Sequence, residues 1–184
     1  MAAAPSNMLP LGTKAPDFNL PDTVSGQDIS LETIESRKGI VIMFICNHCP
    51  FVLHVQKEIV KIAQEYSAKE FSFIAISSND VQNYPQDSPE NMQLHARNHN
   101  FNFPYLYDES QDIAKAYQAA CTPDFYVFNE NNNLYYRGRM DESTPGNSIL
   151  VTGRDLRLAL DGLDDGQPHH ANQFPSIGCN IKWK

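Results

Sequence analysis

The chain has 184 residues, a formal net charge of −8 and no residue type that dominates any stretch. Its length is typical of one domain that buries a hydrophobic core. The 14 Lys and Arg residues never cluster beyond residues 137–139 and 182–184, so the chain lacks the basic patch that binds phosphate backbones or anionic lipid. The composition therefore argues against nucleic acids and membrane surfaces as partners.

The N-terminal sequence predicts a cytoplasmic protein. No Lys or Arg precedes Lys14, and residues 1–13 contain no continuous apolar segment, so a secretory signal is not indicated. The longest apolar run, residues 40–46, is far shorter than the roughly 20 residues that a membrane-spanning helix requires. We therefore expect no membrane span.

Apolar periodicity predicts strands and helices that alternate along the chain. In chain order we expect a loose lead-in (1–11), a hairpin around 25–27, a short helix (30–34), a buried strand (39–45), a helix after Pro50, a strand (71–77), a helix (88–98), a short strand (103–107), a helix (111–120), a β-hairpin (124–128 and 134–139), a helix (about 154–163) and a tail (166–184). The connection between the strands at 39–45 and 71–77 is long enough for a parallel pair. No linker divides the chain, so we expect a single α/β domain over residues 1–184.

The motif Cys46-Asn47-His48-Cys49-Pro50 is the strongest chemical signal in the sequence. Cys46 follows a buried strand at the point where a helix begins, and helix N-termini favour a thiolate, which lowers a cysteine pKa from about 8.5 to roughly 3.5–7.5. Cys49 stands one helical turn later, so it can attack a mixed disulfide on Cys46 and release the product. His48 can donate to the thiolate and stabilise the reduced form.

Together with this motif, residues 12–18 and the Thr122-Pro123 pair resemble the thioredoxin superfamily, in its redoxin or AhpC/TSA branch. The resemblance covers about residues 12–184 and implies a thioredoxin fold, a three-layer α/β/α sandwich with a central mixed sheet, here with an N-terminal hairpin extension. It implies a thiol–disulfide oxidoreductase without an organic cofactor, in which Cys46 is the nucleophile and Cys49 resolves the intermediate. Thr122 and a cis Pro123 would hold the substrate backbone, with Asn47 and Pro50 beside them.

The chain departs from two branches of the superfamily. Peroxiredoxins carry a Pro seven residues, and a Thr or Ser three residues, before the peroxide-attacking cysteine, whereas this chain has Gly39 and Met43. Thioredoxin has a Trp before its first cysteine and a buried acid in the preceding strand, whereas this chain has Ile45 and no acid in 39–45. Dithiol exchange is compatible with both departures. A peroxiredoxin-like peroxidase, which would form a sulfenic acid on Cys46, is the alternative.

Two further thiols have open roles. Cys121 precedes the expected cis-proline, so it is either an auxiliary thiol within reach of Cys46 or a small buried hydrophobe. Cys179 either pairs with Cys121 or stays free, because the sequence does not choose among connectivities. A third hypothesis is a metal-binding module that uses the cysteines, but the strand before the motif and the helix after it favour redox chemistry without a metal. The expected partners are a protein or small-molecule disulfide or thiol and an external thiol reductant.

Overall fold

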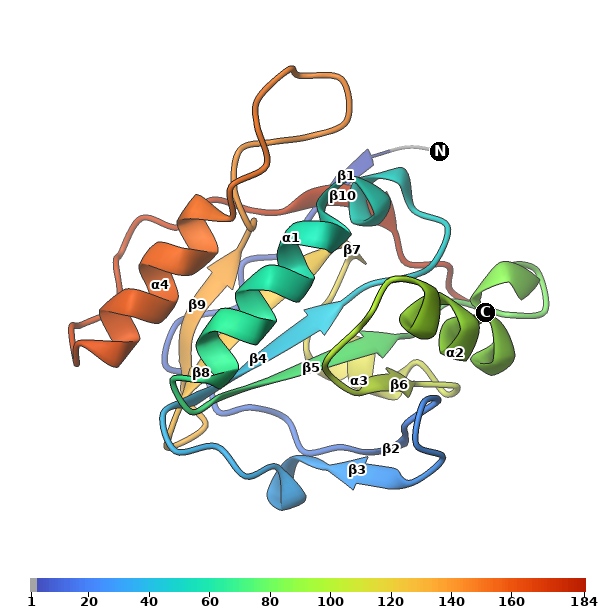
Figure 1. Cartoon of the computed structure of the whole chain (residues 1–184), viewed down its shortest axis with the longest axis horizontal. Helices are drawn as coiled ribbons and strands as arrows, with labels where there is room; N and C mark the ends of the chain where they lie inside the picture. Colours follow the sequence, from blue (N-terminus) through green and yellow to red (C-terminus); the bar gives the residue numbers. More distant parts are fainter. Residues whose placement is uncertain (1–2) are drawn as a thin grey trace.

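The computed structural model describes residues 3–184, and its centre is a five-stranded mixed sheet (Figure 1). The strand order is β6-β5-β4-β8-β9. The first three strands along that order are parallel, and β8 and β9 run antiparallel to their neighbours. Their bounds are β4 Gly39–Phe44, β5 Phe71–Ser77, β6 Tyr105–Tyr107, β8 Asp124–Asn129 and β9 Leu134–Gly138. The central mixed sheet predicted from the sequence is therefore confirmed.

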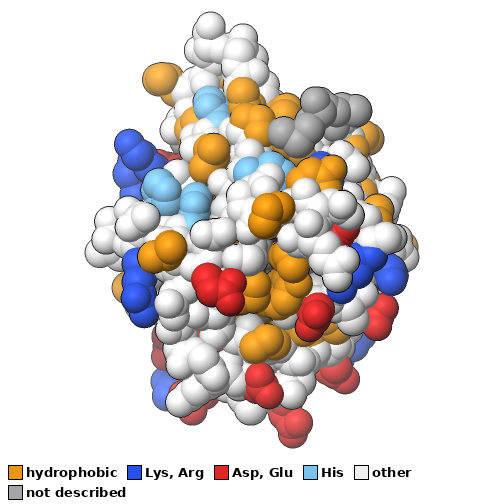
Figure 2. All heavy atoms as spheres, turned by 90° about the vertical axis from the view of Figure 1, so that its right-hand side faces the viewer, with side chains coloured by type: hydrophobic (Ala, Val, Ile, Leu, Met, Phe, Trp, Pro, Cys, Tyr) orange, Lys and Arg blue, Asp and Glu red, His pale blue; other side chains and the backbone are white. Residues whose placement is uncertain are grey.

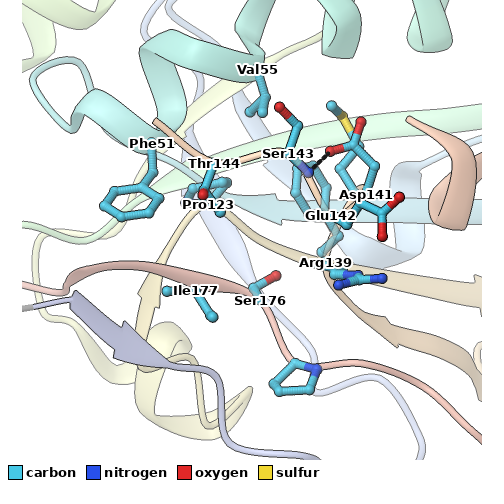
Figure 3. Close-up of a pocket in the computed structure, with 13 residues that line it drawn as sticks. Phe51, Val55, Pro123, Arg139, Asp141, Glu142, Ser143, Thr144, Ser176 and Ile177 are labelled. Atoms are coloured by element: carbon cyan, nitrogen blue, oxygen red, sulfur yellow. Dashed lines mark hydrogen bonds between the residues drawn. The ribbon is translucent and has the colours of Figure 1, made fainter. Parts of the chain in front are cut away.

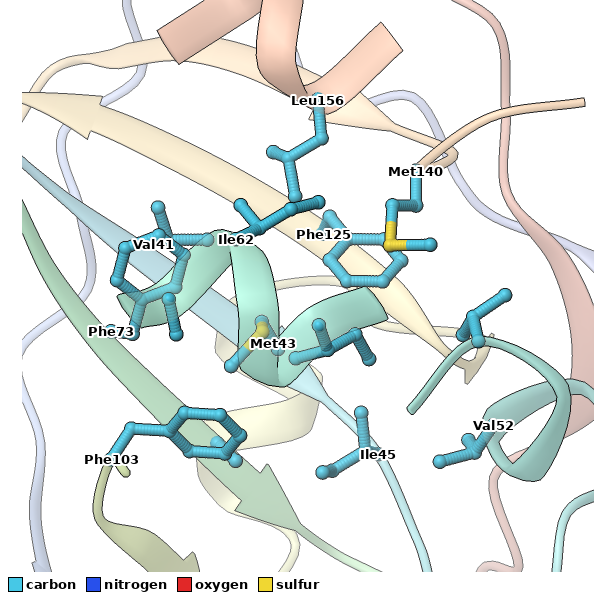
Figure 4. Packing of buried hydrophobic residues seen from close by; sticks show 14 of the residues in the cluster. Val41, Met43, Ile45, Val52, Ile62, Phe73, Phe103, Phe125, Met140 and Leu156 are labelled. Atoms are coloured by element: carbon cyan, nitrogen blue, oxygen red, sulfur yellow. The ribbon is translucent and has the colours of Figure 1, made fainter. Parts of the chain in front are cut away.

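The apolar run of β4 is explained by its place in the middle of the sheet, because helices and loops cover both of its faces. Alternate residues such as Val41 and Met43 pack under α1 and α4, where Leu156 also lies (Figure 4). Ile42 and Phe44 point into a second cluster on the other face. The first face is covered by three helices, α1 Pro50–Ser67, α2 Pro89–Asn98 and α4 Arg154–Asp164. The second face is covered by the short helix α3 Asp112–Ala116 and by the hairpin of β2 Asn19–Pro21 and β3 Asp28–Ser30. Two short 3-10 helices, Leu31–Thr33 and Pro85–Asp87, lie in connecting segments.

Both ends of the chain carry a strand, although the sequence predicts a loose lead-in and a tail there. β1 (Ala3–Pro5) and β7 (Cys121–Thr122) flank β10 (Ile177–Asn180) in an antiparallel three-stranded sheet. These strands have two to four residues, too few to show an alternating pattern, and their partners are far apart in sequence. The C-terminal segment is thus built into the domain, and Ile181 after it is buried in the core.

The helices agree with the apolar periodicity except at α3. That helix ends at Ala116, four residues before the predicted end, because Gln118 has a left-handed φ of 52° and turns the chain toward β7. Tyr117 lies after the helix and is still fully buried, so the apolar spacing continues where the helix does not. In the described part of the chain, no helix has the length and apolar character needed to cross a bilayer.

Candidate active site

The two cysteines of the C-x-x-C motif lie at the carboxyl end of β4, in the connection to α1. Strand β4 ends at Phe44, and α1 begins at Pro50 with Cys49 as its N-cap residue. Both thiols are buried, with exposed fractions of 2% for Cys46 and 0% for Cys49. The motif therefore has the strand-to-helix placement that the sequence predicts.

The expected cis-proline lies directly against the cysteine pair. The peptide bond between Thr122 and Pro123 is cis. The Thr122 hydroxyl oxygen is 3.4 Å from Cys46 Sγ, and Cys49 Sγ lies 3.2 Å from the Thr122 carbonyl oxygen. The fold thus brings the cysteine pair into contact with the Thr122-Pro123 pair, which lies more than 70 positions later in the sequence.

The surroundings of the pair lower the pKa of Cys49 and raise the pKa of Cys46, whereas the sequence predicts the lowered pKa at Cys46. A hydrogen bond from the Cys46 thiol lowers the pKa of Cys49 to about 5, helped by Cys179 and by backbone N–H groups at the start of α1. Donation of that same hydrogen bond raises the pKa of Cys46, and burial and the nearby Asp87 carboxylate raise it further. Position contributes as well, because the helix begins four residues after Cys46 and directly after Cys49, so its free N–H groups favour a negative charge on Cys49.

His48 contacts a buried carboxylate that the sequence analysis missed. Its Nδ1 is 2.7 Å from Asp87 Oδ2, and its ring stacks on Tyr84. Asp87 is fully buried and also accepts hydrogen bonds from the Asn47 backbone and the Asn79 side chain, both at 2.8 Å. His48 therefore pairs with a buried acid, and polar atoms of Cys46, His48 and Asp87 lie within 4.8 Å of one another.

Nothing in the sequence indicates that Asp87 lies next to the C-x-x-C motif. The residue precedes Ser88, the N-cap of α2, so in the sequence it resembles an exposed turn residue. Only the folded chain carries it next to the motif, at the end of the short 3-10 helix Pro85–Asp87. It supplies the buried acid that is absent from residues 39–45.

The resemblance places Asn47 and Pro50 at the substrate site, but in the structure both side chains lie outside the pocket beside the cis-proline. The Asn47 side chain donates to the Gln86 carbonyl at 2.9 Å and accepts from the Tyr105 hydroxyl at 3.1 Å, so it holds the motif against neighbouring loops. Pro50 is exposed at the first position of α1. Neither side chain lines the pocket beside the cis-proline.

A small pocket of about 90 Å³ adjoins the cis-proline (Figure 3). Phe51 and Val55 from the first turns of α1 form one wall, and Pro123 and Ile177 lie opposite. Its polar rim comes from the segment after β9, where the Ser143 backbone donates to the Asp141 carboxylate. The pocket therefore offers apolar walls next to the motif.

The molecular face at which β4 ends has no concentration of positive charge. Figure 2 shows this face, the right-hand side of Figure 1, with hydrophobic side chains near its centre and histidines above them. Lys and Arg side chains lie at its flanks, and acidic side chains lie in its lower half.

The two auxiliary thiols lie at different places around the motif. Cys179 in β10 is 2.8 Å from Cys49, sulfur to sulfur. Cys121 in β7 is buried and its sulfur is 3.9 Å from the Pro123 carbonyl oxygen. The register pairs Cys179 with Thr122 and Asn180 with Cys121. Cys179 therefore faces the C-x-x-C pair, which the sequence analysis did not anticipate.

One side-chain group near the motif has ligand types suitable for a metal ion. Cys46, His48 and Asp87 place a sulfur, a nitrogen and an oxygen within 4.8 Å of one another. Among residues 3–184 this is the one set of three such side chains whose ligand atoms all lie within 4.8 Å of one another. Sulfur and imidazole ligands with a carboxylate are a set that Zn²⁺ accepts.

Comparison with known proteins gives the chain a family. The model of the AhpC/TSA family matches residues 11–137. The crystal structure of an uncharacterized conserved protein from Geobacillus kaustophilus is 55% identical, with a TM-score of 0.98, and the match covers 100% of this chain and 97% of that chain. A hypothetical protein from Sinorhizobium meliloti 1021 is 42% identical, with a TM-score of 0.95 and 98% of each chain covered.

More distant similarity supports the fold alone. Peroxidoxin BcpB from Mycobacterium tuberculosis is 18% identical, with a TM-score of 0.63 over 84% of this chain and 96% of that chain. None of the curated proteins compared matches the chain. The family match spans more than half of the sequence and agrees with the mixed sheet, the C-x-x-C motif and the cis-proline. The chain therefore belongs to the AhpC/TSA family and has its thioredoxin-like α/β fold.

Proposed function

We propose that the protein is a thiol–disulfide oxidoreductase whose reactive groups are Cys46 and Cys49. The observation that carries the proposal is the buried thiol pair itself, which lies against the cis-proline segment, with both sulfurs in contact with Thr122 and the pKa of Cys49 lowered to about 5. A dithiol in which one of the two sulfurs is a thiolate at neutral pH exchanges rapidly with disulfides.

In the first step Cys46 attacks a substrate disulfide. The Cys49 thiolate takes the Cys46 proton, the Cys46 sulfur forms a bond to one substrate sulfur, and the substrate S–S bond breaks to release the other sulfur as a thiolate. In the second step Cys49 loses that proton and attacks Cys46. The Cys46–Cys49 disulfide forms and the second substrate sulfur leaves, so the protein is oxidised and the substrate is reduced.

Asp87 and His48 are the proposed route for the proton that Cys49 must lose. Polar atoms of Cys46, His48 and Asp87 lie within 4.8 Å of one another, and the His48–Asp87 contact is 2.7 Å. A buried carboxylate beside an imidazole accepts a proton without a free water molecule. The same carboxylate raises the pKa of Cys46, which keeps the resting charge on Cys49.

The low pKa of Cys49 also supports a direction of electron flow. A thiolate that is stabilised in the reduced protein favours the dithiol over the disulfide, which makes the couple more oxidising. We therefore propose that the disulfide form accepts electrons readily from an external thiol. The substrate is a disulfide or oxidised thiol whose backbone lies along Thr122 and Pro123 and whose side chain enters the apolar pocket at Phe51.

Peroxide reduction is a second candidate function, which one contact favours. The Thr122 hydroxyl is 3.4 Å from Cys46 Sγ, so a hydroxyl is present although position 43 lacks one. In that reaction the Cys46 sulfur would attack the hydroperoxide, the O–O bond would break to release an alcohol, or water from hydrogen peroxide, and Cys46 would become a sulfenic acid. Condensation of the sulfenic acid with the Cys49 thiol would then form the disulfide and release water.

One paired measurement separates the two functions. Pre-reduced protein is mixed separately with oxidised glutathione and with hydrogen peroxide at equal concentration, and the loss of free Cys46 is followed by alkylation and mass spectrometry. We expect fast loss with the disulfide and slow loss with peroxide. The reverse order would overturn the proposal and assign a peroxidase, and a fixed stoichiometry of bound zinc with no thiol loss would indicate a metal-binding protein.

The substitution Asp87→Asn tests the proton route. Asparagine keeps the side-chain shape but cannot take up the proton, so we expect resolution of the mixed disulfide to slow by about 100-fold, the lower end for a general base. The attack step on the substrate should change much less. Quenched-flow measurement of both steps over a pH series checks this, because resolution in the variant should recover as hydroxide takes over at high pH. Equal slowing of both steps at every pH would show that Asp87 is only structural.

A further inference from the structure

We propose that Cys179 is a third redox-active thiol, which exchanges with the Cys46–Cys49 disulfide to form a Cys49–Cys179 disulfide and leave Cys46 free. The proposal rests on the proposed function, because that function generates the Cys46–Cys49 disulfide. The oxidised protein would then have two disulfide forms, and the second would include a cysteine of the C-terminal strand β10.

The first observation is the distance between the two sulfur atoms. Cys49 Sγ and Cys179 Sγ are 2.8 Å apart, which is shorter than van der Waals contact between two sulfur atoms and approaches the bonded separation of about 2.05 Å. The pair is buried, with Cys49 at 0% and Cys179 at 3% exposure. A thiol at this distance can form a bond to the Cys49 sulfur with almost no movement of the chain.

The second observation is that the backbone of β10 is adapted to this approach. Cys179 pairs with Thr122 in the register between β10 and β7, so β10 lies over the same residue that contacts both motif cysteines. The preceding residue is Gly178, and a Cβ at this position would collide with the Thr122 carbonyl group. Only glycine therefore lets the strand come close enough to place Cys179 on Cys49.

The third observation is that Cys179 is held in place from both sides. β1 pairs with it from the other edge, where Ala3 is its partner in the register. Beyond β10, the Lys182 backbone N–H donates to the Asn79 side chain at 2.8 Å, and Asn79 in turn donates to Asp87. The C-terminal segment is thus linked to the buried acid of the motif as well as to the cysteine pair.

The exchange is balanced within the protein. The Cys179 sulfur forms a bond to the Cys49 sulfur, the Cys46–Cys49 bond breaks, and the proton of the Cys179 thiol passes to the departing Cys46 sulfur. No external oxidant or reductant takes part. Burial raises the pKa of the Cys179 thiol to about 12, so the ordinary state of this residue is a protonated thiol, which supplies the proton that the departing Cys46 sulfur takes up.

Cys121 provides a matched control. It is as buried as Cys179 and lies on the neighbouring strand β7, but its sulfur contacts the Pro123 carbonyl oxygen. Burial likewise raises the pKa of this thiol above its usual value. A difference between the two thiols would therefore come from the contact with Cys49 and not from burial or cysteine number.

The test is disulfide mapping of the full chain during oxidation. Reduced wild-type protein is mixed with oxidised glutathione near neutral pH, quenched with an alkylating reagent at increasing times, digested and analysed by mass spectrometry. We expect the Cys46–Cys49 linked peptide first, then the Cys49–Cys179 linked peptide together with alkylated Cys46. The Cys179→Ser variant should lose the second species and the alkylated Cys46, and the Cys121→Ser variant should keep both.

The outcomes separate this inference from the function on which it rests. A Cys46–Cys49 peptide with Cys179 alkylated at all times would overturn the role of Cys179 and leave the oxidoreductase in place. A Cys121–Cys179 peptide would overturn it as well. If no disulfide that contains Cys46 forms, the proposed function itself fails. The wild-type time course decides the matter even if the Cys179→Ser variant does not fold, which circular dichroism would show.

Discussion

Replacing Cys46 by serine should reduce disulfide exchange to the rate of the uncatalysed reaction. A serine hydroxyl is similar in size to the thiol and keeps the contact with Thr122, but it is not ionised near neutral pH and does not attack a disulfide. The measurement is reduction of a chromogenic disulfide by wild-type and Cys46→Ser protein with excess thiol reductant.

The companion variant Cys49→Ser should have the opposite signature. Its Cys46 still attacks, but the mixed disulfide is not resolved, so the substrate half should accumulate on Cys46 as a stable adduct visible in the intact mass. Attack should also be slower, since Cys46 loses the thiolate that takes its proton. Cys121→Ser serves as the control for removing a buried thiol. Wild-type exchange in both motif variants would contradict the assignment of Cys46 and Cys49.

The largest effect on stability is expected from Arg137→Met. Arg137 and Asp124 are both fully buried, and the guanidinium lies 3.5 Å from the Asp124 carboxylate and over the Tyr126 ring. Removing one member of a buried ion pair leaves an uncompensated charge, which costs about 3–5 kcal/mol. The free energy of unfolding, measured with denaturant at about pH 8, should fall by that amount.

The pH dependence identifies the electrostatic part of that loss. Burial raises the pKa of Asp124 to about 7, and Arg137 lowers it from a still higher value. Since the folded pKa lies above the unfolded one, ionisation of Asp124 costs stability as the pH rises toward about 7, and the cost then levels off. In Arg137→Met the pKa rises further, so the cost continues to grow above pH 7.

The difference in unfolding free energy between wild type and Arg137→Met should therefore be larger at about pH 8 than at about pH 5.5. Adding Asp124→Asn removes the ionisable carboxyl, so the double variant should regain part of the stability and lose the pH dependence. A difference that is the same at both pH values in the single variant would show that the effect comes from packing alone.

Several features of the site follow from local sequence. The apolar run at 39–45 predicts a strand covered on both faces, and the change to helical spacing after Pro50 predicts α1. Cysteines at the junction of those two patterns necessarily lie at the carboxyl end of a buried strand. Thr122-Pro123 could be assigned because it stands between a helix and a hairpin in the order typical of the superfamily.

The features that the sequence left undetermined depend on contacts between distant segments. β10 has four residues and pairs with β1 and β7, so no local pattern marks it as a strand, and the approach of Cys179 to Cys49 could not be predicted. Asp87 resembles a surface residue before a helix cap, and burial next to His48 appears only when the loop after β5 folds over the motif.

The location of the thiolate also depends partly on local sequence and partly on contacts between distant segments. The sequence predicts that a helix begins near the cysteine pair and that its N-terminus stabilises a negative charge there. Which sulfur holds the charge depends on where the first helical turn begins, on hydrogen bonds from Cys46 and Cys179, and on the Asp87 carboxylate. The sequence by itself therefore predicted the α/β fold, from local periodicity, and the family and the position of the C-x-x-C pair, from motifs of adjacent residues. The tertiary structure decided the charge, the buried acid and the third thiol, because these depend on long-range packing.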